Sequence, residues 1–224
     1  DWVVAIHPED GASVFNTSVP GNVVALTEET TDLDSDNPTG VAIHNGVAYI
    51  GTQFDGLNRY IIANQTFLGS WVSTGINDVD FAPVAILGSN PQVLHMGLPG
   101  YGVARKDLSS GEILIPLTVE PNRPNAGSTE VLPSSQVYAI EANSGNSGLF
   151  IGTSNGAVYW DGKSASELST GGSWNLQPSQ FFDFAIDAST SGGTVYAGTN
   201  IGVCKYSVST LAIDDCVTVS YTHL

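Results

Sequence analysis

Four ionisable side chains each follow an Ala-Ile dipeptide at the end of a predicted strand: His7, His44, Glu141 and Asp187. Histidine and carboxylate side chains can bind a metal ion or act as general acids and bases. If the four segments occupy equivalent positions in a repeated fold, these side chains could line a common channel. The alternative, which we favour, is that each residue ends its strand at a turn and faces water. We therefore expect no metal site.

Two further patterns are typical of catalytic sites. Residues 152–156 match G-x-S-x-G, in which a serine nucleophile is exposed between a strand and a helix. Here the flanking pattern is strand, turn, strand, so Ser154 is predicted to be a turn residue. The carboxylate pairs Asp78/Asp80 and Asp183/Asp187 could hydrolyse glycosides at a suitable separation. Surface charges explain them more simply, and we expect no catalytic residue and no cofactor.

The composition indicates an all-β protein with an acidic surface. The 224 residues include 25 Gly and 11 Pro, and apolar residues alternate in short runs without a helical period. The net charge of −16, with only six Lys and Arg, disfavours binding to nucleic acid. No apolar run approaches the ~18 residues needed to span a bilayer, so no membrane insertion is expected.

One stretch recurs along the chain and organises it. GLFIGTSNGAVYWD at 148–161 is repeated closely at 194–207 and 47–60, and more loosely at 91–107 and 13–26. With Asn16, Gly51, Gly97, Gly152 and Gly198 taken as equivalent, the spacings are 35, 46, 55 and 46 residues. Such periods in an all-strand pattern predict the blades of a β-propeller.

We expect about five four-stranded blades, in units of about 1–40, 41–75, 76–136, 137–179 and 180–216. Residues 3–7, VVAIH, are predicted to form the inner strand of the first unit. Residues 217–224 form an irregular tail that fits no position in the repeat, as a cloning or read-through artefact would. The chain begins at Asp1 without Met, so we expect further domains in the same polypeptide.

The two cysteines predict a disulfide. Cys204 and Cys216 are symmetric about Thr210, as a cross-strand pair flanking a hairpin turn would be. A disulfide requires an oxidising compartment, which favours an extracytoplasmic location.

With the repeat laid out, residues 137–161 resemble the two-component-regulator propeller repeat. The resemblance rests on Val137, Ile140, Gly148, Phe150, Gly152, Thr153, Gly156 and Asp161, with Tyr49 and Tyr196 at the aromatic position in two other units. It implies a propeller blade from the extracytoplasmic sensing region of a signalling protein. It also implies a larger ring of about seven blades.

In a propeller, the turns between second and third strands emerge on the same side as the connections between blades. We expect any ligand on that side, which collects Gln53, Phe54, Asp55, Asn77, Asp78, Tyr101, Arg123, Ser154, Asn155, Gln180 and Asn200. Aromatic rings beside amides and hydroxyls suit a neutral polar ligand such as a sugar. The alternative is that these are ordinary turn residues.

The function favoured by the sequence is that of a non-catalytic extracytoplasmic propeller that binds a ligand, senses, or contacts another protein. The partner would be a small molecule, a glycan or a protein. Two alternatives remain open, because propellers host all three roles. One is a glycoside hydrolase or lyase on a propeller scaffold, and the other is a structural or adhesive repeat on a cell surface.

Overall fold

The computed structural model describes residues 2–7, 9–19, 21–29, 33, 35–71, 78–83, 92–119, 132–143, 148–162, 165–168, 178–187, 189 and 193–218. Every regular secondary-structure element in these residues is a β-strand, which confirms the predicted fold class, an all-β propeller of about five blades. The described part of the chain holds no helix able to cross a membrane. The chain divides into two compact units, Asp1–Phe81 and Ala82–Leu224.

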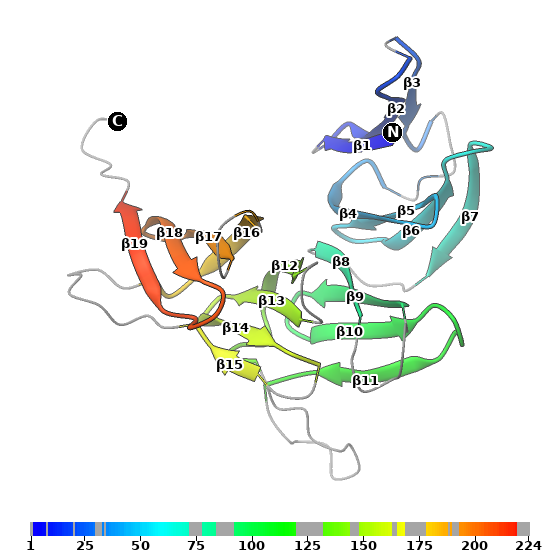
Figure 1. Ribbon diagram of the computed structural model, residues 1–224. Helices are drawn as coiled ribbons and strands as arrows, with labels where there is room; N and C mark the ends of the chain where they lie inside the picture. Colours follow the sequence, from blue (N-terminus) through cyan, green and yellow to red (C-terminus); the bar gives the residue numbers. More distant parts are fainter. Residues whose placement is uncertain are drawn as a thin grey trace. The chain divides into compact units, whose positions relative to one another are not determined.

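Five antiparallel sheets follow one another along the chain, and each sheet is one blade (Figure 1). Blade 1 consists of β1 (Trp2–His7), β2 (Gly11–Asn16) and β3 (Val23–Leu26). Blade 2 consists of β4 (Pro38–His44), β5 (Val47–Thr52), β6 (Gly56–Ile61) and β7 (Thr66–Trp71). Blade 3 consists of β8 (Asp78–Pro83), β9 (Gln92–Leu98), β10 (Gly102–Asp107) and β11 (Ile113–Leu117). Blade 4 consists of β12 (Val137–Asn143), β13 (Gly148–Thr153), β14 (Gly156–Trp160) and β15 (Ala165–Glu167). Blade 5 consists of β16 (Phe181–Asp187), β17 (Thr194–Thr199), β18 (Gly202–Ser207) and β19 (Ile213–Thr218).

The turns explain several glycines of the repeat. Asn45 and Gly46 join β4 to β5 with φ angles of 48° and 76°, the positive values that a type I′ hairpin turn requires. A glycine also opens the third strand of blades 2 to 5. At Gly102, φ is +83° and an added Cβ would lie 2.2 Å from the carbonyl oxygen of Leu117 on the adjacent strand. A side chain is therefore excluded at this position.

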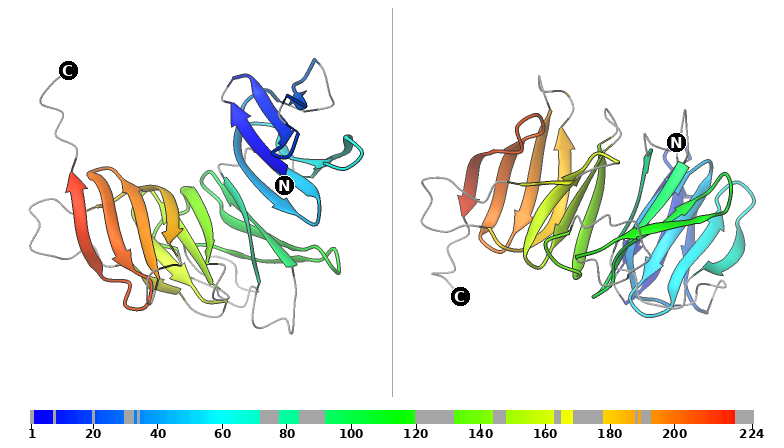
Figure 2. Two further views of the ribbon diagram at one scale, coloured as in Figure 1. Left: turned by 45° about the horizontal axis from the view of Figure 1, so that its top comes forward. Right: turned by 90° about the horizontal axis from the view of Figure 1, so that it is seen from below.

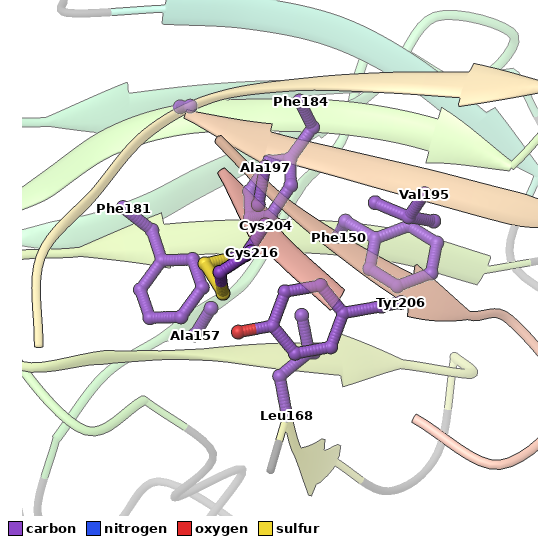
Figure 3. Close-up of a cluster of buried hydrophobic side chains, with 11 residues drawn as sticks. Phe150, Ala157, Leu168, Phe181, Phe184, Val195, Ala197, Cys204, Tyr206 and Cys216 are labelled. Carbon is purple, nitrogen blue, oxygen red and sulfur yellow. A yellow bond between two sulfur atoms is a disulfide. The ribbon is translucent and has the colours of Figure 1, made fainter. Parts of the chain in front are cut away.

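Blades pack on one another through buried apolar side chains. One cluster joins blades 1 and 2, a second joins blades 3 and 4, and a third joins blades 4 and 5. In the second unit, blade 4 therefore lies between the sheets of blades 3 and 5 (Figure 2). We call the side of a blade that packs on the following blade its forward face, and the opposite side its backward face. In the third cluster, Phe150 and Leu168 of blade 4 meet Val195 and Tyr206 of blade 5 (Figure 3).

Blade 1 differs from the prediction, because β1 is not an inner strand. His7 pairs with Gly11 at the start of β2, as Thr52 pairs with Gly56 at the start of β6. The strand β1 therefore corresponds to β5, the second strand of blade 2. The prediction that residues 3–7 form an inner strand is wrong, and the described residues of blade 1 contain no counterpart of the inner strand.

The same register corrects the repeat spacing. Ile6, and not Asn16, occupies the position of Gly51, since Ile6 pairs with Ala12 as Gly51 pairs with Leu57. The first spacing is then 45 residues in place of 35, close to the 46 that follow.

The predicted disulfide is present. Cys204 and Cys216 are bonded and lie directly opposite each other in β18 and β19. Both are buried in the cluster between blades 4 and 5, beside Tyr206 (Figure 3).

Candidate functional site

The Gly-Thr dipeptide of the repeat builds the turn between second and third strands. The Thr153 hydroxyl donates to the carbonyl oxygen of Gly156 at 2.7 Å and accepts from the Asn155 N–H at 3.2 Å. Thr52 and Thr199 brace their turns in the same way. These threonines are structural, because both hydrogen-bonding roles of each hydroxyl are used within the turn.

In the second unit, these turns are hydrogen-bonded to the connections between blades. The backbone N–H groups of Gly102 and Ser154 donate to two consecutive carbonyls, those of Ser135 and Gln136, at 2.9 and 3.0 Å. The next connection repeats the arrangement: Gly156 and Asn200 donate to the carbonyls of Ser179 and Gln180, at 2.7 and 3.2 Å. Each connection is thus held between the turn of one blade and the turn of the next.

Side chains strengthen this ladder. The Asn200 Oδ1 atom accepts from the N–H groups of Ser179 and Gln180 at 2.9 and 3.1 Å. The hydroxyls of Ser134 and Ser154 hydrogen-bond at 2.8 Å. The result is a continuous surface held by backbone and side-chain bonds, which we call the loop face of the second unit. It consists of residues 99–101, 132–136, 154–155, 178–180 and 200–201.

The residues of the loop face that the structure describes carry no charged side chain, since they are Pro, Gly, Tyr, Leu, Ser, Gln, Asn and Ile. Tyr101 projects from this face with 70% of its surface exposed. The corresponding turns of the first unit are acidic: Gly11 and Gln53 donate to the carbonyls of Asp36 and Asn37, and the turns carry Glu9, Asp10 and Asp55. The two units therefore offer different chemistry at equivalent positions.

The residues predicted to face a ligand are distributed between the two units. Gln53, Phe54 and Asp55 form a turn of the first unit, in which Phe54 is 66% exposed. Tyr101, Ser154, Asn155, Gln180 and Asn200 lie on the loop face of the second unit. Asn77 and Arg123 lie outside the described residues, as does the side chain of Asp78.

The four side chains that follow Ala-Ile are not equivalent in the structure. His44 and Asp187 both end an inner strand, in the first and second unit respectively. Glu141 lies two positions earlier in its strand, paired with Phe150. His7 ends a second strand, where its Nε2 hydrogen-bonds the Ser13 hydroxyl. The four residues therefore do not share one strand position, which was the condition for a common channel, because the dipeptide recurs in different registers. The favoured alternative, that each ends its strand, is met by His7, His44 and Asp187 but not by Glu141.

The catalytic motifs have structural explanations. Ser154 lies in a strand–turn–strand segment, as predicted, and contacts Ser134. The Asp187 carboxylate accepts from the hydroxyl and N–H of Ser189, and these bonds lower the pKa of Asp187. Among the described residues, no group of three or more His, Cys, Asp or Glu side chains is placed to hold a metal ion.

A buried polar cluster between blades 3 and 4 was not predicted. His95 of β9 is fully buried and lies opposite Arg105 of β10, and its ring meets Trp160 edge-on at 5.8 Å. The Arg105 guanidinium lies 4.8 Å from the centre of the Trp160 ring and donates from Nε to the Ile115 carbonyl at 2.8 Å. The signal that could have identified it is the register: His95 occupies the aromatic position of the repeat, where blade 4 has Phe150.

Burial determines the ionisation of this cluster. Desolvation lowers the pKa of His95 to about 3, the positive charge of Arg105 acts in the same direction, and the backbone of Val93 opposes both. Desolvation also lowers the pKa of Arg105 to about 10. At neutral pH the histidine is therefore uncharged and the arginine charged.

No family model and no curated protein matches this chain. Solved structures do match it. The computationally designed Ika8 protein has a TM-score of 0.59 and 12% identity over 98% of this chain and 62% of Ika8. The extracellular domain of a one-component system from B. thetaiotaomicron has a TM-score of 0.62 and 16% identity, over 96% of this chain and 28% of that one. The extracellular domain of a hybrid two-component system from B. thetaiotaomicron has a TM-score of 0.60 and 18% identity, over 92% and 27%.

The likeness is one of fold. At 12 to 18% identity it does not extend to a family or an activity. The chain spans less than two thirds of each of these three structures and under a third of the two extracellular domains.

Proposed function

We propose that this chain is part of an extracytoplasmic, non-catalytic β-propeller that binds a neutral polar ligand, such as a glycan, on the loop face of its second unit. One observation carries the proposal. The chain has 22 acidic residues and a net charge of −16, yet the described residues of the loop face of the second unit carry no charged side chain. A surface without charges neither attracts ions nor repels neutral molecules, so it suits a ligand that is recognised by hydrogen bonds and stacking.

The exposed groups on this face match the chemistry of a sugar. Tyr101 offers an exposed aromatic ring on which the apolar face of a pyranose can stack. Asn155 is also exposed and lies in the corresponding turn of the next blade, where its amide offers hydrogen-bond donors and an acceptor. The hydrogen-bonded ladder below them fixes the backbone before a ligand arrives, which lowers the entropy cost of binding.

Two observations support the extracytoplasmic location. The Cys204–Cys216 disulfide persists only where thiols are not kept reduced. Two of the similar structures are extracellular domains of one- and two-component systems. We infer that this chain belongs to the sensing part of such a protein and acts by binding a ligand, without catalysing a reaction.

The experiment is a glycan-array screen of the chain, followed by titration calorimetry on each glycan retained. Tyr101→Ala should weaken binding about tenfold, the effect of losing one stacked aromatic ring. Asn155→Ala should weaken it by a smaller factor. Ile113→Ala is the matched control, because Ile113 is a similarly exposed apolar residue away from the loop face, and it should leave affinity unchanged.

Three outcomes would contradict the proposal. A chain that retains no neutral glycan does not have the proposed ligand. Binding unaffected by both loop-face substitutions would place the site elsewhere. Cleavage of a bound glycan, detected by mass spectrometry of the recovered ligand, would favour the glycoside hydrolase or lyase alternative.

A further inference from the structure

Two asparagines of the first unit lie in the sequence pattern that N-linked glycosylation requires. The pattern is Asn, any residue except Pro, and then Ser or Thr. The triplet Asn-x-Ser/Thr occurs three times in the chain, at residues 16–18, 37–39 and 64–66. Pro38 disqualifies the second triplet, so Asn16 and Asn64 are the two candidate acceptors.

The structure places both asparagines at the same turn of consecutive blades. Asn16 is the last residue of β2, which is the third strand of blade 1, because β1 corresponds to the second strand of blade 2. Asn64 lies between β6 and β7, the third and fourth strands of blade 2. Each asparagine therefore belongs to the turn that joins the third strand of its blade to the fourth.

This turn lies at the far end of the third strand from the turn that meets the connections between blades. Gly11 and Gly56 begin the two third strands, and each strand has six residues, a length of about 20 Å. The disqualified Asn37 lies at the near end, where its carbonyl oxygen accepts from the N–H of Gln53. Glycans on Asn16 and Asn64 would therefore leave that side of each blade uncovered.

Asn64 has the exposure that a bulky glycan needs. Asn64, Gln65 and Thr66 are all exposed, and the Thr66 hydroxyl donates to the carbonyl oxygen of Asn64 at 3.2 Å. Asn64 lies beyond the ends of the strands, so it belongs to neither the forward nor the backward face of blade 2. The packing of one blade on another therefore does not require its burial.

Asn16 can be modified without loss of its own hydrogen bond. It is half-buried and is followed by the exposed residues Thr17 and Ser18. Its Oδ1 atom accepts from the Ser18 N–H at 2.9 Å. An N-linked glycan is attached through the Nδ2 atom, so Oδ1 remains an acceptor in the modified residue.

We propose that Asn16 and Asn64 carry N-linked glycans. The donor is an oligosaccharide joined to a lipid through pyrophosphate. A bond forms between Nδ2 and the anomeric carbon of the sugar, the bond from that carbon to the pyrophosphate oxygen breaks, and the proton lost by the amide goes to the leaving lipid pyrophosphate. The inference rests on the extracytoplasmic location within the proposed function, because this modification belongs to secreted proteins. It does not depend on the ligand of the loop face.

The test is intact-mass spectrometry of residues 1–224 secreted from a eukaryotic host, before and after treatment with peptide-N-glycosidase. The enzyme should remove the mass of two glycans and convert Asn16 and Asn64 to aspartate, which peptide mapping locates. Asn64→Gln and Thr66→Ala should each leave one glycan, whereas Thr66→Ser, which keeps the hydroxyl, should retain both. Asn22→Gln is the matched control, because Asn22 is an exposed asparagine of the same turn as Asn16 but lies outside the pattern. It should also retain both glycans.

The outcomes separate this inference from the proposed function. A secreted chain that contains the Cys204–Cys216 bond but no glycan would overturn the inference and leave the extracytoplasmic location intact. A glycan on only one of the two asparagines would overturn the assignment of the other. Binding on the glycan array should be the same before and after the enzyme treatment, because the modified turns lie away from the loop face. An array on which the glycosylated chain retains no glycan would contradict the proposed function alone.

Discussion

At the scale of single residues, close contacts between blades identify positions that tolerate no added atom. A Cβ at Gly152 of blade 4 would lie 2.7 Å from the carbonyl oxygen of Phe181 and 3.0 Å from its Cβ, both in blade 5. Gly198 is the equivalent residue of blade 5, where a Cβ would meet nothing closer than 3.7 Å, and only its own blade. Alanine substitutions at the two glycines therefore separate the free-energy cost of a clash with the next blade from the effect of alanine on the backbone itself.

Gly152→Ala should destabilise the chain by about 1 to 3 kcal/mol, because the backbone of Phe181 must shift. Gly198→Ala should be neutral, or stabilising by up to about 1 kcal/mol, since alanine restricts the unfolded chain. Urea unfolding of both variants measures the difference. Equal free energies of unfolding would show that the interface between blades 4 and 5 is looser than described.

The buried histidine predicts a specific dependence of stability on pH. The pKa of His95 is lowered to about 3 in the folded chain, while an unfolded histidine titrates near 6.5. Below about pH 6.5 only the unfolded state gains the proton, so stability is full above that pH and declines as pH falls toward 3. The expected loss is about 1 kcal/mol per pH unit in this range.

His95→Phe should remove this component, and it introduces the residue that blade 4 has at the equivalent position, Phe150. The measurement is the free energy of unfolding of both proteins from pH 7 to pH 4. The difference isolates His95 from the carboxylates, which titrate in both. Replacement of the exposed His7 by Gln is the control. A difference that does not change with pH would contradict the assigned burial of His95.

At the scale of strands and sheets, the disulfide ties the outer strand of blade 5 to its neighbour. β19 ends the last blade and has one hydrogen-bonded neighbour, β18, to which the Cys204–Cys216 bond attaches it. With a sequence separation of 12, reduction should cost about 3 kcal/mol of stability. Urea unfolding with and without reductant checks this, and a Cys204→Ala/Cys216→Ala double variant should not respond to the reductant. Detection of two alkylatable thiols in the unreduced, denatured protein would contradict the presence of the disulfide.

The strands show how far the sequence could predict this fold. Alternating apolar residues identify the strands of blades 2 to 5, together with the Gly-Thr dipeptide in blades 2, 4 and 5 and with Gly97 and Gly102 in blade 3, because these signals are local. The assignment of β1 failed because an Ala-Ile dipeptide suits an inner or a second strand equally well. A comparison of the turns would have resolved it: His7-Pro8-Glu9-Asp10-Gly11 has the length and ending of Thr52-Gln53-Phe54-Asp55-Gly56.

The side of the blades on which the candidate site lies could be predicted from the sequence, but the hydrogen bonds that build it could not. Propeller topology brings turns and connections to one side, and in the structure the turns that contain Tyr101, Asn155 and Asn200 are hydrogen-bonded to the connections between blades. That these residues bind a ligand stays a prediction. The pairing of consecutive carbonyls with two turns depends on the register between blades, which no local pattern encodes. The repeat marks His95 as a buried position, but its contacts with Arg105 and Trp160 were missed, because these residues come from three strands of two blades.

At the scale of the whole molecule, the central claim is that a neutral ligand binds the loop face of the second unit. The most direct measurement is hydrogen–deuterium exchange with and without a glycan retained in the array. We predict that the ligand slows exchange in peptides covering residues 99–102, 132–136, 154–156 and 178–180. Exchange should be unchanged at the turns 108–111 and 208–211, which join third to fourth strands. Slower exchange at those turns, with none on the loop face, would contradict the account.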